Sequence, residues 1–232
     1  MIEVVGLSAR GWSDLPERLR ATIQSADVLL GSPRLIDLIP PFPAQQRLAW
    51  PSPLREGLPT LLSQVAGRRI VALASGDPLV AGIGSTLVEM LGAAEVRIHP
   101  ALSSVAIARA RMGWPEESTQ LVRLRGGDLD GVRRYLFPGR RLIILSRDAD
   151  SPGAVAELLI DEGYGDSTMT VLGDLDTETE SRTEARARDW TGPGPALNVI
   201  SVTCAGTGRG ASLAPGLPDE LFDHDGQLTK RD

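Results

Sequence analysis

The chain has 232 residues, of which 42% are hydrophobic and 23% charged, a composition typical of a soluble globular protein. Its formal net charge of −6 argues against a general nucleic-acid binder, since such proteins gain affinity mainly by neutralising phosphates. No apolar stretch approaches the roughly 18 residues of a membrane span, and the amino terminus shows no signal-peptide pattern, so we expect no membrane contact and a cytoplasmic location.

Three residue types that often carry chemistry are scarce. Cys204 is the only cysteine, which excludes an intrachain disulfide and suits a reducing compartment. With a single Cys and only His99 and His224 as histidines, we predict no protein-built zinc site and assign no metal ligand, and metal binding through carboxylates alone stays an open alternative. Of the 24 basic residues only Lys230 is a lysine, so Schiff-base catalysis and pyridoxal-phosphate attachment are not expected.

The first half of the sequence alternates short apolar runs with helical segments. Strands are predicted at 2–6, 28–30, 46–49, 69–74 and 95–98, and helices at 14–25, 33–39, 56–66, 83–91 and 103–112. We expect Ser13 to cap the first helix, with Pro16 and Glu17 in its first turn. Such alternation predicts an α/β domain, a mostly parallel sheet with helices on both faces.

The second half predicts a smaller, mixed α/β domain. Strands are expected at 119–124, 141–146, 168–172 and 197–203, and helices at 128–136 and 152–162. Ser151 and Pro152 suit the cap and first position of the last helix. Because Gly113 and Pro115 end the preceding helix, we place a linker at 113–118. The domains are then 1–112 and 119–204, followed by a flexible tail, 205–232.

Three strand-to-loop junctions in the first half are rich in Gly, Ser and Pro: 6–11, 75–78 and 99–104. In an open α/β sheet, ligands bind outside the carboxyl ends of the strands, so these loops predict one composite small-molecule pocket. A plainer interpretation also fits. Asp77, Ser103 and Ser104 are good helix caps, and Gly76 and Pro78 supply turn geometry.

The order of these motifs resembles the tetrapyrrole methylase family: Val-Val-Gly near residue 6, Ser-Gly-Asp-Pro near 77 and Pro-x-x-Ser-Ser near 103. The resemblance implies a two-domain fold with S-adenosylmethionine in the cleft. Segments 27–34 and 145–148 resemble the C5-methylating branch of corrin biosynthesis. The tail at 222–231 resembles the opening of the C15-methylating, decarboxylating domain found in fused members.

The resemblance implies a C-methyltransferase that acts on C5 of a corrin precursor, of the precorrin-6Y or cobalt-precorrin-7 type, in cobalamin biosynthesis. Its expected partners are that precursor and a C15-methylating, decarboxylating domain or subunit, and family analogy adds a possible homodimer. Carried over by position, the cofactor-binding residues are Gly6, Leu7, Gly76, Asp77, Pro78, Val80, Gly82, Ser103, Ser104, Leu145 and Ser146.

For the substrate we nominate Arg10, Arg34 and Arg147, because the planar guanidinium fork binds carboxylates such as the acetate and propionate arms of corrin precursors. His99 is either a proton acceptor or a structural histidine, and no catalytic residue is assigned. The acidic stretch 173–180 is either a solvated loop or, as in the family, a lid near the cofactor.

One departure keeps alternatives open. Ser8 and Ala9 occupy positions where the family often has Gly and Pro, which puts a close backbone approach to the ligand in doubt. The first alternative is a family member with another acceptor, such as a porphyrinogen, ribosomal RNA or the diphthamide precursor. The second is a non-catalytic domain that binds a nucleotide or a tetrapyrrole.

Overall fold

The computed structural model describes residues 1–124 and 129–208, and the chain folds into two compact units. The first unit consists of Met1–Ile107 and Leu175–Glu180, and the second begins with Ala108–Asp174 and resumes at Ser181. The units therefore meet inside helix α5 (Ser104–Met112), earlier than the linker we placed at 113–118. Part of that stretch is helical, because Glu116–Ser118 form the 3₁₀ turn η3.

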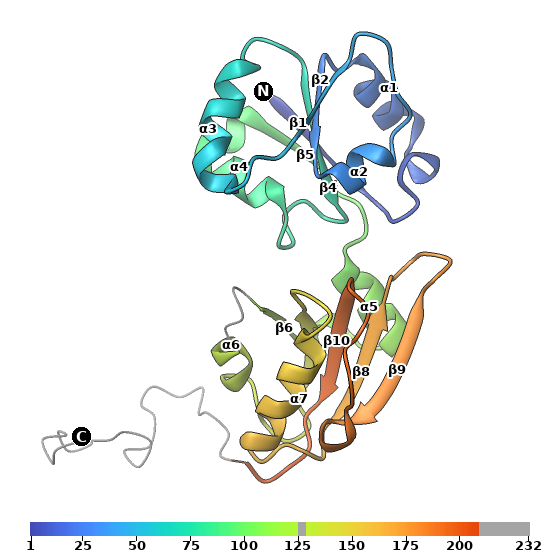
Figure 1. Ribbon diagram of the computed structural model, residues 1–232, viewed down its shortest axis with the longest axis vertical. Coiled ribbons are helices and arrows are strands. Elements are labelled where there is room, and N and C mark those ends of the chain that lie inside the picture. Colours follow the sequence, from blue (N-terminus) through green and yellow to red (C-terminus); the bar gives the residue numbers. More distant parts are fainter. Residues whose placement is uncertain (125–128, 209–232) are drawn as a thin grey trace, which may run out of the picture. The chain divides into compact units, whose positions relative to one another are not determined.

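The first unit is a five-stranded parallel sheet with the order β3-β2-β4-β1-β5. Its strands are β1 (Ile2–Leu7), β2 (Val28–Gly31), β3 (Gln46–Ala49), β4 (Ile70–Ser75) and β5 (Val96–His99). Its helices are η1 (Gly11–Asp14), α1 (Glu17–Ser25), α2 (Pro33–Asp37), α3 (Leu54–Gln64), α4 (Ile83–Leu91) and η2 (Ala93–Glu95). The doubly covered sheet confirms the predicted α/β class (Figure 1).

Alternation along the strands produces the two cores of this unit. Side chains such as Val4 and Leu30 pack with Leu58 of α3 and Leu87 of α4 on one face. Neighbouring positions on the strands point the other way and pack under α1 and α2, with Ile23 fully buried there. Because both faces of the central strands are covered, their sequence is a continuous apolar run.

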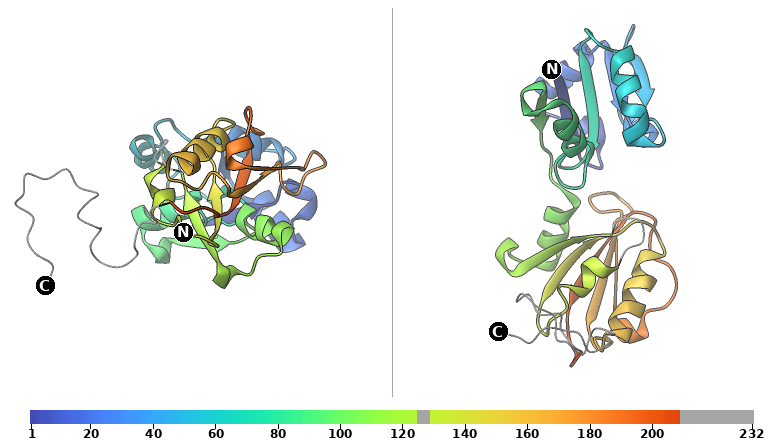
Figure 2. Two further views of the ribbon diagram at one scale, coloured as in Figure 1. Left: turned by 90° about the horizontal axis from the view of Figure 1, so that it is seen from below. Right: turned by 90° about the vertical axis from the view of Figure 1, so that its left-hand side faces the viewer.

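The second unit has a mixed five-stranded sheet with the order β6-β7-β10-β8-β9, in which only β6 and β7 run parallel. Its elements after α5 and η3 are β6 (Thr119–Arg123), α6 (Asp130–Arg133), β7 (Arg141–Leu145), α7 (Ser151–Asp161), β8 (Thr168–Gly173), β9 (Ser181–Arg186), η4 (Ala187–Asp189) and β10 (Asn198–Thr203). Figure 2 shows α7 and α5 on opposite faces of this sheet.

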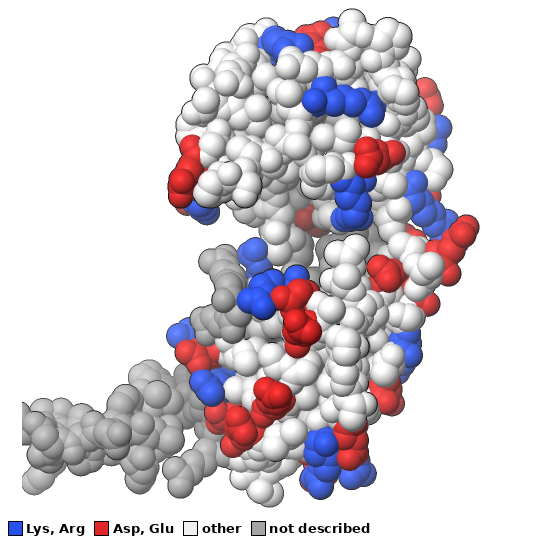
Figure 3. Space-filling model, in the orientation of Figure 1, with Lys and Arg blue, Asp and Glu red and all other residues white. Residues whose placement is uncertain are grey.

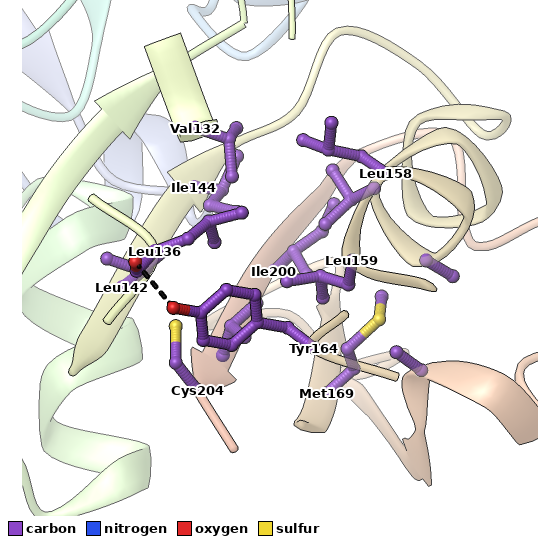
Figure 4. Packing of buried hydrophobic residues seen from close by; sticks show 14 of the residues in the cluster. Val132, Leu136, Leu142, Ile144, Leu158, Leu159, Tyr164, Met169, Ile200 and Cys204 are labelled. Atoms are coloured by element: carbon purple, nitrogen blue, oxygen red, sulfur yellow. Dashed lines mark hydrogen bonds between the residues drawn. The ribbon is translucent and has the colours of Figure 1, made fainter. Parts of the chain in front are cut away.

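The core of the second unit lies between its sheet and helices α6 and α7 (Figure 4). Tyr164 is fully buried there, and its hydroxyl donates to the carbonyl of Leu136 at 2.9 Å. Cys204 is also buried, and burial raises the pKa of its thiol to about 11. The thiol is therefore protonated near neutral pH and unsuited to act as a nucleophile.

Three sequence predictions differ from the structure. The first helix begins at Glu17 after Pro16, and Ser13 lies in η1, where its hydroxyl donates to Arg10 O and caps nothing. Strand β9 was missed because its side chains are mostly exposed and polar, so it has no apolar alternation. The helix expected at 128–136 is observed as Asp130–Arg133, and its predicted start at residue 128 lies outside the described residues.

The start of the predicted tail belongs to the second unit, because Ala205 N donates to Ser167 Oγ at 2.9 Å. Residues 209–232 of the tail lie outside the described residues. Among the residues that are described, no helix is long and apolar enough to cross a membrane. Basic and acidic side chains are interspersed on the face shown in Figure 3.

Candidate functional site

The loops that follow β1, β4 and β5 meet at the carboxyl edge of the first sheet, where these three strands are neighbours. A Cβ atom on Gly6 would lie 2.1 Å from Gly76 O and 2.8 Å from Ala101 N. Gly76 has a φ of +60°, and its own Cβ would lie 2.9 Å from Leu102 O. Since Gly76 N also donates to Leu7 O at 2.7 Å, the three loops pack backbone against backbone.

The Gly76-Asp77-Pro78 turn has a defined internal structure. Oδ1 of Asp77 accepts a hydrogen bond from Leu79 N at 2.8 Å, and Asp77 O accepts one from Val80 N at 3.1 Å. Asp77 therefore stabilises its own turn and does not cap α4, whose N-cap is Gly82 with no side-chain hydrogen bond. In the described part of the chain, Oδ2 of Asp77 has no hydrogen-bond partner.

The start of α4 packs tightly on this turn. A Cβ on Gly82 would lie 2.6 Å from Pro78 O, and one on Gly84 would lie 2.8 Å from Pro78 Cβ. Pro78 is buried, whereas the side chain of Leu79 beside it is 52% exposed. The glycines after Gly-Asp-Pro thus allow the helix to begin directly against the loop.

In the third loop, Ser103 caps α5: its Oγ accepts a hydrogen bond from Ala106 N at 3.1 Å. Ser104 is the first residue of that helix. The neighbouring Leu102 is 69% exposed, so an apolar side chain borders the loop junction. His99 Nε2 lies 2.5 Å from Glu3 Oε2 and is only 14% exposed, which favours its structural interpretation.

The first loop accommodates the residues that depart from the family pattern. Ser8 Oγ donates to Asp14 Oδ2 at 2.7 Å and accepts from Arg10 N at 3.2 Å. Gly11, with a φ of +57°, donates from its backbone to Ser8 O. The hydroxyl of Ser8 is thus engaged within its own loop.

The acidic segment Leu175–Glu180 packs as part of the first unit, although it follows β8 in sequence. Arg10 lies 3.7 Å from Asp176 Oδ1, so the first loop is paired with this segment. Asp176 has a φ of +63°, and its N–H donates to Glu180 Oε2 at 2.8 Å. The segment is therefore not merely a solvated loop. Arg34, in contrast, is exposed on α2.

The remaining predicted residues lie at the end of β7 in the second unit. Leu145 is the last residue of the strand, and Ser146 and Arg147 follow it. Arg147 Nε pairs with Asp148 Oδ2 at 2.6 Å. That guanidinium, with the Ser151 hydroxyl, lowers the pKa of Asp148 below its usual range. Ser151 also accepts hydrogen bonds from the backbone N–H groups of Arg147 and Asp148.

Asn198, at the start of β10, is a candidate that our sequence analysis missed. Its Nδ2 donates to Asp148 O at 3.1 Å and to Pro195 O at 2.7 Å. The only sequence signal was a polar amide next to an apolar strand, in Leu-Asn-Val-Ile. Over residues 1–124 and 129–208, no cluster of three His, Cys, Asp or Glu side chains could hold a metal ion.

A model of the family described as tetrapyrrole (corrin/porphyrin) methylases matches residues 1–189. The chain belongs to this family. Its first loop, Gly-Asp-Pro turn and third loop all fall within the matched span.

Two curated proteins are among the relatives that are similar to this chain. A precorrin-6Y C(5,15)-methyltransferase [decarboxylating] from Mycobacterium tuberculosis is 40% identical over 235 residues, covering 99% of this chain and 58% of the relative. A cobalt-precorrin-7 C(5)-methyltransferase from Salmonella typhimurium is 31% identical, covering 78% of this chain and 88% of the relative. The chain thus spans little more than half the length of the mycobacterial protein.

Among solved structures, the precorrin-6Y methylase of Archaeoglobus fulgidus matches 88% of this chain and 98% of its own, with a TM-score of 0.66 and 26% identity. The match confirms the two-part α/β architecture that the sequence predicted.

Proposed function

We propose that the chain is an S-adenosylmethionine-dependent C-methyltransferase that acts on C5 of a corrin precursor in cobalamin biosynthesis. The supporting relatives are named for methylation at C5, and the Salmonella protein is nearly spanned by this chain. The observation that carries the proposal is the junction of three loops at Gly6, Gly76 and Ala101, placed where open α/β sheets bind ligands.

The described residues fit the cofactor. S-adenosylmethionine carries an ammonium group and ribose hydroxyls, which need acceptors, and Asp77 Oδ2 is an acceptor without a partner in the described chain. Leu79 and Leu102, in the loops after β4 and β5, have exposed apolar side chains. We propose that the cofactor contacts Gly6, Leu7, Gly76, Asp77, Pro78, Val80, Gly82, Ser103 and Ser104 in the first unit, and Leu145 and Ser146 in the second.

The bound cofactor would supply a methyl group already activated by its sulfonium. The chain's own task is then to hold donor and acceptor in line and to exclude water, and orientation alone lowers such barriers by about 7–11 kcal/mol. This division of labour agrees with a site whose rigidity comes from backbone packing. Such a reaction does not require His99 as a base, and His99 is paired with Glu3.

For the substrate we propose that Arg10, Arg34 and Arg147 recognise peripheral carboxylates. Arg10 is paired with Asp176, and Arg147 with Asp148. A substrate carboxylate would therefore have to replace the aspartate as the partner of each arginine. Arg34 is exposed and needs no such exchange.

We further propose that the precursor is of the precorrin-6Y or cobalt-precorrin-7 type. The mycobacterial relative is named for both C5 and C15 and is much longer than this chain, so the proposed partner is a C15-methylating, decarboxylating domain or subunit.

Calorimetric titration with S-adenosylhomocysteine tests the cofactor site, with Asp77→Ala as the variant. We expect micromolar binding that weakens at least tenfold in the variant, which corresponds to about 1.4 kcal/mol. Ser75→Ala is the matched control, since Ser75 is an exposed residue at the end of the same strand. Incubation with cobalt-precorrin-7 and S-adenosylmethionine, followed by mass spectrometry, tests the transfer of one methyl group. A folded chain that binds no S-adenosylhomocysteine would contradict the proposal and favour a non-catalytic domain.

A further inference from the structure

The first loop places Arg10 at a defined point of a tight turn. Its φ of −82° and ψ of −5° are those of the third residue of a type I turn. The carbonyl of Ser8 accepts a hydrogen bond from Gly11 N at 3.0 Å, which closes the turn around Ala9 and Arg10. Serine is favoured at the first position of such turns and glycine at the fourth, so the sequence Ser-Ala-Arg-Gly suits the observed backbone.

The backbone of Arg10 is held on both sides by serine hydroxyls. Its N–H donates to Ser8 Oγ at 3.2 Å, and its carbonyl accepts from Ser13 Oγ at 3.0 Å. The Ser8 hydroxyl donates to Asp14 Oδ2 at 2.7 Å, a length typical of a bond to a carboxylate. Because a carboxylate only accepts, Asp14 fixes the direction of this hydroxyl and leaves its oxygen lone pairs for Arg10 N.

The side chain of Arg10, in contrast, is left open. It is 63% exposed, and its guanidinium lies 3.7 Å from Asp176 Oδ1, which is longer than a hydrogen bond. Within the described residues this guanidinium donates no hydrogen bond, whereas that of Arg147 donates to Asp148 Oδ2 at 2.6 Å. A substrate carboxylate therefore has only a loose ion pair to replace at Arg10, and the planar guanidinium fork suits such a ligand.

A purely electrostatic role for Asp14 predicts the opposite of a positioning role. A negative charge in the loop of Arg10 repels an anionic substrate, so removal of that charge alone would tighten binding. If Asp14 instead positions Arg10, the same removal weakens binding. The direction of the change therefore separates the two roles.

We propose that Asp14, acting through the Ser8 hydroxyl, is a positioning residue that fixes Arg10 to receive a carboxylate of the substrate. The inference rests on the proposed function and deepens it, because it names the residues that orient one of the proposed substrate arginines. It also gives Ser8 a role. At a position where the family often has glycine, its hydroxyl connects Asp14 to the backbone of Arg10.

The test measures methyl transfer to cobalt-precorrin-7 and calorimetric binding of S-adenosylhomocysteine by Asp14→Ala. We expect the KM for cobalt-precorrin-7 to rise with unchanged kcat, because the lost contact serves the bound substrate and the transition state alike. The expected rise is about fivefold, which corresponds to about 1 kcal/mol, the net value of one hydrogen bond. The Kd of S-adenosylhomocysteine should stay within about twofold of the wild-type value.

Two variants control for the loss of charge. Asp14→Asn is neutral but keeps an oxygen acceptor for Ser8, so its KM should stay close to that of wild type. Glu17→Ala removes the same charge from a nearby exposed position, and among the described residues Glu17 has no hydrogen-bonded or ionic side-chain partner. The KM of this variant should not rise.

Arg10→Ala decides whether Asp14 acts through Arg10. We expect this variant to raise the KM at least as much as Asp14→Ala does, and the double variant to match Arg10→Ala. Additive effects overturn the assignment, as does an unchanged KM in either single variant. A KM that falls in Asp14→Ala, or a loss of S-adenosylhomocysteine binding there, overturns it too.

Thermal unfolding checks that each variant folds. If Asp14→Ala does not fold, Ser8→Ala takes its place, since it removes the same hydrogen bond from the other partner. Absence of methyl transfer by the wild-type chain overturns the proposed function. Transfer with a KM that does not respond to Asp14 overturns only its positioning role.

Discussion

The carboxyl edge of the first sheet and the edge of the second sheet at which β7 ends are held together by different means. In the first unit, the loops after β1, β4 and β5 touch through backbone atoms at Gly6 and Gly76. In the second unit, the turn after β7 is held by side chains: Ser151 binds two backbone N–H groups, and Asn198 binds a carbonyl. The first edge depends on glycines, which have no side chain at the contact, and the second depends on particular polar side chains.

This difference explains why the first loop tolerates Ser8 and Ala9. The contact between loops is made at Gly6, and Ser8 turns its hydroxyl to Asp14 and to its own loop. The second edge should tolerate fewer substitutions, because replacing any one polar group leaves its hydrogen-bond partner unsatisfied.

The largest expected effect is that of Gly6→Ala. The new Cβ would lie 2.1 Å from Gly76 O, which is a backbone atom and cannot move aside as a flexible side chain would. We expect the free energy of unfolding to fall by on the order of 3 kcal/mol, at the upper end for overpacking, and binding of S-adenosylhomocysteine to be lost. Urea denaturation and calorimetry measure the two effects.

Gly153→Ala in α7 is the control for this substitution. No atom lies within 4 Å of the Cβ that would be added there, so we expect a gain of about 0.5–1 kcal/mol from the better helix former. If Gly6→Ala were as stable as wild type, the three loops would not be packed against each other as described.

The same contrast shows what sequence could predict. The apolar runs at β1, β2 and β4 were recognisable because both faces of these strands are buried. The exposed strand β9 has no such pattern and was missed. The glycines at the loop junction, Gly6, Gly76 and Gly82, were predicted as cofactor-binding residues from their positions in the motifs, and that role stays a prediction. The approach of Gly6 to Gly76 and the pairing of Arg10 with Asp176 join residues far apart in the chain, which local patterns do not encode.

An intermediate effect is expected for Ser151→Ala in the second unit. The hydroxyl is buried, accepts from two backbone N–H groups and donates to Asp148 Oδ1 at 2.9 Å. Ser151 is the first residue of α7 and not its N-cap, which is Asp150, so the sequence prediction of a Ser151 cap is wrong. Loss of the hydroxyl should still lower the free energy of unfolding by about 1–2 kcal/mol, because its buried partners would lose their hydrogen bonds. Ser63→Ala is the comparison, because Ser63 is exposed near the end of α3 and should change stability little. Equal effects at the two serines would refute a holding role for Ser151.

The smallest effect concerns acid sensitivity and again separates the two units. Arg69 hydrogen-bonds Asp27 in the first unit and lowers its pKa from 3.8 to about 2. A depressed pKa stabilises the fold above the unfolded value, and that contribution is lost as the pH falls from about 4 towards 2. Asp27→Asn should therefore flatten the fall in stability over this window.

The pKa of Asp148 in the second unit is also lowered, first by Arg147 and then by Ser151. Arg147 is its neighbour in sequence, so part of this attraction persists in the unfolded chain, whereas Arg69 is 42 positions from Asp27. We therefore expect Asp148→Asn to reduce the acid-induced fall in the free energy of unfolding by less than Asp27→Asn does. Urea denaturation of both variants between pH 2 and pH 5 decides, and the reverse order would mean that the Ser151 network, not the long-range ion pair, dominates acid sensitivity.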